Sequence, residues 1–449
     1  MSSQSHPLRN SGIYRNLPNF DPKLQGLKAI ICGATGISGF NTLRSLLDHP
    51  SRWSMVYALS RSPLSDEQMK LLSKEQADRV KHVSIDLSQN GEGIAKQLKE
   101  AGVEADYVFY YTYLQPKEDK DGNSLGPMDP RMADVLVDAN VPPFRNFLEA
   151  ISSAGIKPKR ILLQTGGKNY GMHVGTGRTP LVESDPQPKH LTNNFYYHQE
   201  RLLFEYCKNH PETSWNVIMP FGVIGAVPNA SMNTFYTFGV YAAVQAAKGE
   251  PLVFGGEWKS WQFDACHSTA RMTGYLSEWA VLEDHCANER FNAHDGSPLS
   301  WDRFFNELAR WYGVSEVKPP SDNKDDYQVM EMAGGKDCPL GYGPPLTVAR
   351  SYALSDWMTE ENNKAVWKKL MESSGGKLTE NPFESDAGGD IGMGDYAYLA
   401  FGTPSLNKVR RFGFNGFVDT LESIFEMYRE MSLYGMLPPM KVDAARPMI

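Results

Sequence analysis

The chain has 449 residues and a mass of 50.2 kDa, more than one small core requires, and its 41 % hydrophobic and 22 % charged residues are ordinary for a folded globular protein. These values exclude a wholly disordered chain and a collagen-like or disulfide-dense scaffold. The formal charge of −8 and the pI of about 5.8 argue against a protein that binds nucleic acid by neutralising phosphates.

The sequence gives no signal for a membrane or for export. No run of about 18 consecutive apolar residues is present, so no membrane span is predicted. The polar residues 1–22 contain no apolar core and do not resemble a signal peptide. The five cysteines are scattered without a C-x-x-C pair, which indicates neither a zinc site nor a disulfide framework. We expect a cytoplasmic protein that binds no metal.

A glycine-rich turn between a strand and a helix is the first functional signal along the chain. The apolar run 27–32 predicts a buried strand, and leucines at helical spacing predict a helix over 40–47. The glycines between them have G-x-x-G-x-x-G spacing, which suits a tight turn, a close approach of backbone to a pyrophosphate, and helix packing on the strand. This context predicts a dinucleotide site, and its candidate residues are Gly33, Thr35, Gly36, Ile37 and Gly39.

The next strand, 54–59, indicates which dinucleotide binds. It ends in Ser60 and Arg61, at the place where NAD-specific sites carry an acid for the ribose 2′-hydroxyl. A guanidinium there suits a 2′-phosphate, so NADPH is the expected cofactor; a solvated surface arginine is the alternative. Three further residues at strand ends are cofactor candidates. They are Asp86 and Leu87 after the third strand, and Tyr110 at the end of the fourth strand. Asp86 and Leu87 could contact the adenine ring; a carboxylate at this place that only caps its own loop is an equally common alternative.

Strands and helices alternate over about 190 residues. Further strands are predicted at 82–85, 107–110, 160–164 and 215–219, with helices between most of them. This alternation predicts an α/β fold, a Rossmann-type doubly wound parallel sheet with a mainly helical C-terminal substrate lobe. The expected domains are a flexible N-terminal arm at 1–25, an NADP-binding domain at 26–228 with a returning segment at about 251–296, and a substrate-binding lobe at 229–250 and 297–449. Two stretches rich in Gly, Pro, Asp and Lys, 318–350 and 373–395, are expected to be long loops.

The fifth predicted strand leads into Thr165 and Lys168. Because the carboxyl ends of the strands face the ligand crevice in a doubly wound sheet, Lys168 is a candidate for the chemistry and Thr165 for cofactor contact. A solvated loop lysine is the simpler alternative.

Two adjacent tyrosines, Tyr196 and Tyr197, begin the next predicted helix. Their side chains point about 100° apart, so only one can face the crevice, and spacing does not decide which. The Tyr-x-x-x-Lys pair of ordinary short-chain dehydrogenases is missing, because Glu200 and Arg201 stand four residues after the two tyrosines.

Several segments together resemble one family of atypical short-chain dehydrogenases/reductases. Residues 165–171 are similar to T-G-x-K-H-Y-x-G-P, 194–200 to N-F-Y-Y-x-x-E-D, 107–113 to H-x-F-Y-x-x-W, 58–63 to A-L-S-R-R-P and 412–420 to G-F-x-G-x-x-D-T. These are signatures of the progesterone 5β-reductase / iridoid synthase-like enzymes, and the likeness spans about residues 26–440. The chain departs from them at Tyr107, Tyr113, Asn169 and Arg201, and in the two long stretches described above, which suggest a fungal-type branch.

The resemblance implies an NADPH-dependent reductase of activated C=C bonds in enones and enals. It implies that Tyr196, by its position in the motif, and Lys168 stabilise the enolate that forms when hydride adds to the β-carbon. Val223, after the sixth strand, is a candidate contact for the nicotinamide carboxamide. Aromatic residues are candidates for an apolar substrate pocket, although such residues are more often core. They are Tyr113, Tyr236, Phe238, Tyr241 and Trp261.

Other functions remain compatible with the sequence. One is an extended short-chain dehydrogenase or epimerase, which would normally carry the missing Tyr-x-x-x-Lys. Another is an NADP-binding sensor or a non-redox cyclase. In the leading interpretation the protein binds a small hydrophobic carbonyl substrate and does not bind nucleic acid. The oligomeric state is left open, with a homodimer among the options.

Overall fold

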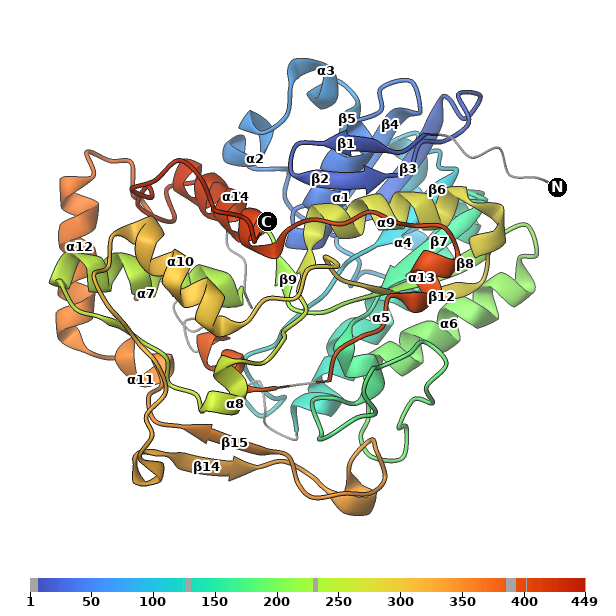
Figure 1. The fold of residues 1–449 in the computed structure, drawn as a ribbon. Helices are drawn as coiled ribbons and strands as arrows, with labels where there is room; N and C mark the ends of the chain where they lie inside the picture. Colours follow the sequence, from blue (N-terminus) through green and yellow to red (C-terminus); the bar gives the residue numbers. More distant parts are fainter. Residues whose placement is uncertain are drawn as a thin grey trace.

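Seven parallel strands form the centre of the molecule, in the order β12-β8-β7-β6-β3-β4-β5 (Figure 1). The computed structural model describes residues 7–123, 125, 131–228, 233–384, 393–400 and 402–448. The strands are β3 (Leu27–Cys32), β4 (Trp53–Ser60), β5 (Val80–Ser84), β6 (Tyr107–Tyr110), β7 (Arg160–Gln164), β8 (Ser214–Pro220) and β12 (Glu289–Ala293). The order reverses between β3 and β6, which places a ligand crevice at the carboxyl ends of these strands. The predicted Rossmann-type α/β fold is confirmed.

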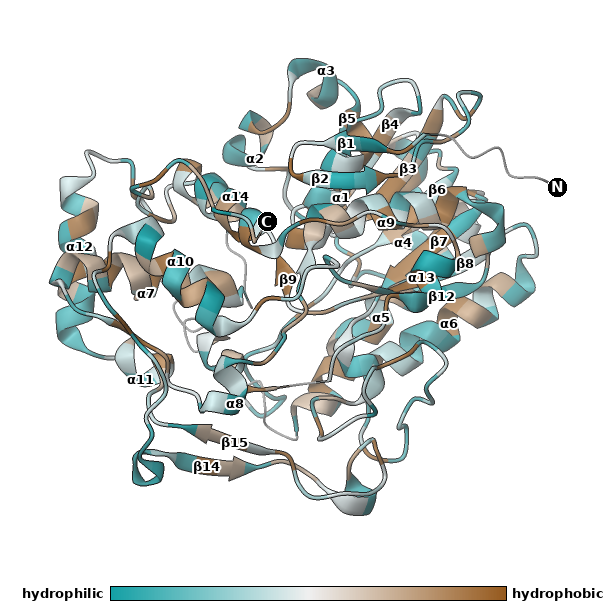
Figure 2. Ribbon diagram, viewed as in Figure 1, coloured by the Kyte–Doolittle hydropathy of each residue, from teal (hydrophilic) through white to brown (hydrophobic). Residues whose placement is uncertain are grey.

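Helices cover both faces of the sheet. Alternate residues of β3 point to opposite faces, so Ala29 and Ile31 join the core under one layer of helices and Ile30 and Cys32 join the core under the other. The first layer is α1 (Ile37–Leu47) and α9 (Ala270–Leu282); the second is α4 (Gly91–Glu100), α5 (Met132–Ala154) and α6 (Phe195–Asn209). Figure 2 shows the apolar strands between helices whose outer faces are hydrophilic. Short helices α2 (Asp66–Lys70) and α3 (Lys74–Ala77) lie between β4 and β5.

A helical lobe with its own aromatic core stands beside the sheet. Its helices are α7 (Thr234–Lys248), α8 (Trp258–Trp261), α10 (Trp301–Tyr312), α11 (Leu354–Trp357), α12 (Glu361–Ser373) and α14 (Thr420–Leu433). Fully buried Trp311 lies at its centre, with ring centroids 6.3 Å from Phe304 and 5.2 Å from Phe425. Two parallel two-stranded pairs connect the parts, β9 (Val223–Ile224) with β11 (Ser268–Thr269) and β10 (Leu252–Val253) with β13 (Val317–Lys318).

Part of the C-terminal region packs with the sheet, which differs from the expected lobe at 297–449. Leu406, Val409, Phe414 and Val418 belong to the core under α1 and α9. Helix α13 (Asn407–Arg411) lies beside β12 (Figure 1). The lobe expected from the sequence is therefore interrupted by a segment that completes the Rossmann core.

Residues 7–25 of the expected flexible arm at 1–25 are packed, whereas residues 1–6 lie outside the described residues. Strands β1 (Arg9–Ser11) and β2 (Tyr14–Leu17) form a hairpin, and Leu17 is completely buried. Tyr14 contacts Tyr275 of α9 with ring centroids 5.4 Å apart. The apolar and aromatic residues of this stretch, rather than its polar ones, decide its structure.

The stretch 318–350, expected to be a loop, contains an antiparallel hairpin of β14 (Gln328–Glu331) and β15 (Thr347–Arg350). The segment that connects β14 to β15 forms hydrogen bonds with a loop that follows Lys168. The Ala333 amide donates to the Val174 carbonyl at 3.2 Å, and the Leu340 amide donates to the Thr176 carbonyl at 2.9 Å. Main-chain pairing of this kind leaves little trace in composition, which is why the prediction failed.

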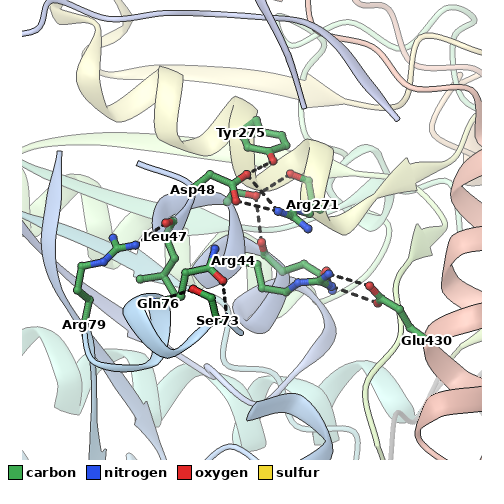
Figure 3. A network of polar contacts seen from close by, with 11 residues as sticks. Arg44, Leu47, Asp48, Ser73, Gln76, Arg79, Arg271, Tyr275 and Glu430 are labelled. Carbon is green, nitrogen blue, oxygen red and sulfur yellow. Dashed lines mark hydrogen bonds and ion pairs between the residues drawn. The ribbon is translucent and has the colours of Figure 1, made fainter. Parts of the chain in front are cut away.

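A polar network fixes the far end of α1 (Figure 3). Arg44 donates from both terminal nitrogens to Glu430 of α14, at 2.7 and 3.1 Å. Arg271 of α9 donates to Asp48, the residue after α1, at 2.9 Å. Arg79 donates to the Leu47 carbonyl at 2.6 Å, where a cation is favourable at a helix C-terminus. The helix is thus held between α9 and the helical lobe.

No helix of the described ranges is both long and apolar enough to cross a membrane. Within the same ranges, no group of three or more His, Cys, Asp or Glu side chains is arranged to hold a metal ion.

Candidate active site

A cavity of about 1450 Å³ opens at the carboxyl ends of the strands. Gly33 follows β3, Arg61 follows β4, Thr165 follows β7 and Phe221 follows β8, and all four line it. The topology therefore brings together segments that are up to 188 residues apart (from 33 to 221). One end is built from the glycine-rich turn, and the other from residues after β7 and at the start of α6.

The glycine-rich end is formed by closely packed backbone. Gly33 has a φ of +75°, in the left-handed region that favours glycine. A Cβ on Gly39 would lie 2.2 Å from the Gly33 carbonyl oxygen, so only glycine lets α1 approach the turn. Helix α1 begins after Gly36 without a side-chain cap, and its first residues line the cavity. Uncapped amide groups and the helix dipole at this point fit a pyrophosphate.

The residues that could hold the remainder of a dinucleotide surround this turn. Exposed Arg61 lines the cavity together with Ser60, which places a cation where a ribose 2′-phosphate would lie. Asp86 and Leu87 also line it. The Asp86 carboxylate accepts from the Ser88 amide at 2.9 Å, and this bond lowers the pKa of Asp86. Asp86 thus caps its own loop at the edge of the cavity. The residues fit a nicotinamide dinucleotide.

Lys168 and Tyr196 both line the opposite end of the cavity. Lys168 lies in the 3₁₀ turn Gly167–Tyr170, directly after β7, and burial lowers its pKa. Among the residues that the structure describes, no carboxylate forms an ion pair with the Lys168 ammonium. Tyr196 is in the first turn of α6, and burial raises its pKa, so its phenol is neutral at physiological pH. A Cβ built on Gly166 would lie 3.5 Å from the Tyr196 hydroxyl, so the phenol faces the end of β7.

Tyr197 points away from the cavity. It is buried, and its hydroxyl donates to the Asn169 carbonyl at 3.3 Å. Glu200, the residue at the place of the usual lysine, is also buried. Its carboxylate accepts from the Asn169 amide at 2.6 Å and pairs with Arg290 at 2.6 Å. The position that is catalytic in other short-chain dehydrogenases therefore holds the 3₁₀ turn against α6.

Most of the predicted site residues meet at the cavity. Besides those described above, Thr35, Ile37, Tyr113 and Val223 line it. Burial raises the pKa of Tyr113, and the neighbouring phenols of Tyr196 and Tyr396 add to this shift.

Three predicted residues do not line the cavity. Tyr110 packs in the core beneath α5, with its ring centroid 4.6 Å from that of Phe144. Tyr236 is buried in the helical lobe, and Trp261 packs there against Phe254. Two other aromatic candidates, Phe238 and Tyr241, lie in the same core. Because neighbouring helical side chains diverge by about 100°, Phe235 lines the cavity while Tyr236 packs inward.

Several lining residues were not identified from the sequence. They are Met172, His173, Phe195, Phe235, Phe263, His267, Trp301, Met393, Tyr396, Ala397 and Leu399. Burial and the nearby Lys168 lower the pKa of His173 to about 4, and burial and His294 lower that of His267 to about 4, so both imidazoles are neutral at pH 7. The reacting end is thus mostly apolar, with the half-buried side chain of Lys168 at its edge.

A family model described as the PRISE-like Rossmann-fold domain matches residues 29–333, about two thirds of the chain. The chain belongs to the PRISE family. A short chain dehydrogenase, gsfE, of Penicillium aethiopicum is 26 % identical over 91 % of this chain and 99 % of its own length. A 3-oxo-Δ(4,5)-steroid 5β-reductase of Arabidopsis thaliana is 25 % identical, with coverage of 91 % and 93 %. An (S)-8-oxocitronellyl enol synthase, ISY2, of Nepeta racemosa is 26 % identical, with coverage of 91 % and 91 %.

Solved structures also match part of this PRISE protein. A UDP-glucose 4-epimerase of Thermotoga maritima matches with 15 % identity and a TM-score of 0.47, covering 66 % of this chain and 87 % of its own. With its membership of the PRISE family, the protein is an oxidoreductase of the short-chain dehydrogenase/reductase type, for which a nicotinamide dinucleotide is the expected cofactor.

Proposed function

We propose that this PRISE protein is an NADPH-dependent reductase that saturates activated C=C bonds of small hydrophobic enones or enals. One observation carries the proposal: a half-buried ammonium without a carboxylate partner in the described structure and a neutral phenol line the same cavity as the glycine-rich turn. The names of the relatives support it, because one is a steroid 5β-reductase and another an oxocitronellyl enol synthase.

The Gly33–Gly39 turn, the start of α1 and Arg61 would hold the dinucleotide. When bound, its reduced nicotinamide supplies the hydride for the β-carbon of the substrate. The residues of this chain then act on the carbonyl oxygen, where negative charge collects as the enolate forms.

Tyr196 and Lys168 have different tasks at that oxygen. Neutral Tyr196 donates a hydrogen bond, and a donor aimed at charge that develops during reaction contributes about 2.7–4 kcal/mol. Lys168 stabilises the same charge through its field, which is strong because the apolar surroundings screen it weakly. Phe195, Phe235 and Trp301 line this end and exclude water from the reacting atoms.

In this division of tasks both groups act on the oxygen directly. Burial raises the pKa of Tyr196, so the residue acts as a neutral donor and not as a phenolate. Lys168, while it is protonated, supplies the positive charge.

The test follows the absorbance of NADPH in the presence of 2-cyclohexen-1-one and of a small enal. We expect consumption of NADPH by the wild-type protein and formation of the saturated carbonyl compound. Tyr196→Phe should lower kcat about 100-fold or more, while Tyr197→Phe, its matched neighbour, should retain most of the activity. Inactivity of Tyr197→Phe alone would reverse the assignment. Tight NADPH binding without turnover of any enone would favour a sensor or cyclase.

A further inference from the structure

The segments that carry Lys168 and Tyr196 are joined by one side-chain amide. Asn194 is buried, with 4 % of its surface exposed. Its Nδ2 donates to the Lys168 carbonyl oxygen at 2.7 Å, and its Oδ1 accepts from the Tyr196 amide at 3.0 Å. A single planar group therefore fixes the distance between the main chains of the two residues.

The two bonds differ in what they do. The bond to the Tyr196 amide is an ordinary N-cap of α6, and an Asp or Ser would also provide it. The bond to the Lys168 carbonyl needs a donor on the same side chain, which Asp lacks and which Ser and Thr carry only as the hydroxyl of a shorter side chain. The second bond is thus the one that a capping role does not explain.

Other contacts between the segments act on neighbouring residues. Tyr197 and Glu200 both bind Asn169, and Glu200 is tied in turn to Arg290. They hold the 3₁₀ turn on the helix, but neither touches Lys168. The carbonyl bond from Asn194 is the contact that acts on the lysine itself.

We propose that Asn194 is a positioning residue that sets Lys168 relative to Tyr196 in the cavity. This inference rests on the proposed function for its effect on catalysis. A displacement of about 1 Å of a catalytic group can lower a rate about 100-fold, so the loss of this bond has a measurable effect. Binding of the dinucleotide depends on the distant glycine-rich turn and changes little.

Asn194→Asp tests the proposal because it keeps the capping oxygen and replaces the donor by a carboxylate oxygen that repels the Lys168 carbonyl. We expect kcat for 2-cyclohexen-1-one to fall about 10- to 100-fold, with the NADPH dissociation constant within about 3-fold of wild type. Asn194→Ser, which caps without adding a charge, should act in the same direction. Asn90→Asp is the matched control, since Asn90 caps α4 through the Gly93 amide and does not line the cavity.

A second measurement is independent of turnover. In the protein without cofactor, the pH dependence of Lys168 acetylation, read by peptide mass spectrometry, reports the pKa of its ammonium. Burial lowers this pKa, so release of the turn should raise it in Asn194→Ser toward that of an ordinary lysine. Melting temperatures of all variants identify any loss of folding.

The outcomes separate the two proposals. If wild type reduces enones and Asn194→Asp and Asn194→Ser match it in kcat and acetylation profile, the positioning role is wrong. If wild type reduces no enone, the proposed function fails, and the acetylation profile alone decides the role of Asn194. In a Lys168→Met background Asn194→Asp should add little; a fully additive loss would show that Asn194 does not act through Lys168.

Discussion

The two ends of the cavity are built in different ways. The nucleotide end consists mainly of backbone from one continuous segment, the strand–turn–helix around Gly33–Gly39. The reacting end consists of side chains from separate segments, including 168–173, 195–196, 235, 263–267 and 393–399. A backbone site depends on steric fit, whereas a side-chain site depends on how distant segments are held together. The two ends should therefore respond differently to substitution.

The largest effect is expected at the nucleotide end. Gly39→Ala would place a Cβ 2.2 Å from the Gly33 carbonyl oxygen. The carbonyl belongs to the main chain and the Cβ is fixed by the backbone of α1, so neither can move aside. We expect no detectable NADPH binding in a fluorescence titration, and therefore no activity. Gly93→Ala, in α4 away from the cavity, should bind NADPH as wild type does. Normal binding by Gly39→Ala would mean that the turn is not a tight backbone cradle.

An effect on turnover without an effect on cofactor binding is expected at the reacting end. Lys168→Met keeps the length of the side chain and removes its charge. We expect kcat to fall about 100- to 1000-fold, while the NADPH dissociation constant changes less than about 10-fold. Stopped-flow measurement of a single turnover, together with a binding titration, separates the two quantities. Equal losses in both would assign Lys168 to cofactor binding.

The pH profile gives a control for the same residue. Lys168 must be protonated to act, and burial lowers its pKa, so kcat/KM should fall with rising pH before an ordinary lysine would titrate, at about 10.4. Because the pKa of Tyr196 is raised, its phenol does not lose its proton in this pH range. The residual activity of Lys168→Met should not fall in this alkaline range. If kcat/KM of the variant still falls there, the decrease must come from the titration of another group.

The smallest effect is expected from the exposed guanidinium of Arg61. Arg61→Glu replaces attraction of a 2′-phosphate by repulsion, and we expect the KM for NADPH to rise about 10- to 100-fold. The KM for NADH should change much less, since that cofactor has a ribose 2′-hydroxyl at this position. Initial rates with both cofactors measure the ratio. Equal changes would show that Arg61 does not select NADPH.

The same contrast explains what the sequence could predict. The glycine spacing and its strand–helix context identified the nucleotide end and the Rossmann fold, because a local motif determines that geometry. Lys168 is predicted by its position after the fifth strand, whereas the choice of Tyr196 over Tyr197 rests on the resemblance of motifs. The bond from Tyr197 to Asn169 is visible only in the structure.

The rest of the reacting end depends on tertiary packing. Tyr236 and Trp261 have the size and polarity of pocket residues, yet they fill the core of the helical lobe. Tyr396 and Ala397 line the cavity and come from the edge of a stretch whose composition suggested only a loop. Hydrophobic patterns identify residues that are buried, but they do not state whether a side chain faces a core or a cavity.

The ion pair between Arg44 and Glu430 has a consequence for how this chain can be divided. It links the first helix of the nucleotide fold to the last long helix of the sequence. Leu406, Phe414 and Val418 meanwhile complete the hydrophobic interior beneath that first helix. A fragment that stopped after the family-matched region at residue 333 would lack these partners and expose an unfinished apolar surface. The two halves of the molecule share this interior, so truncation from the C-terminus should impair the part that lies earliest in the sequence.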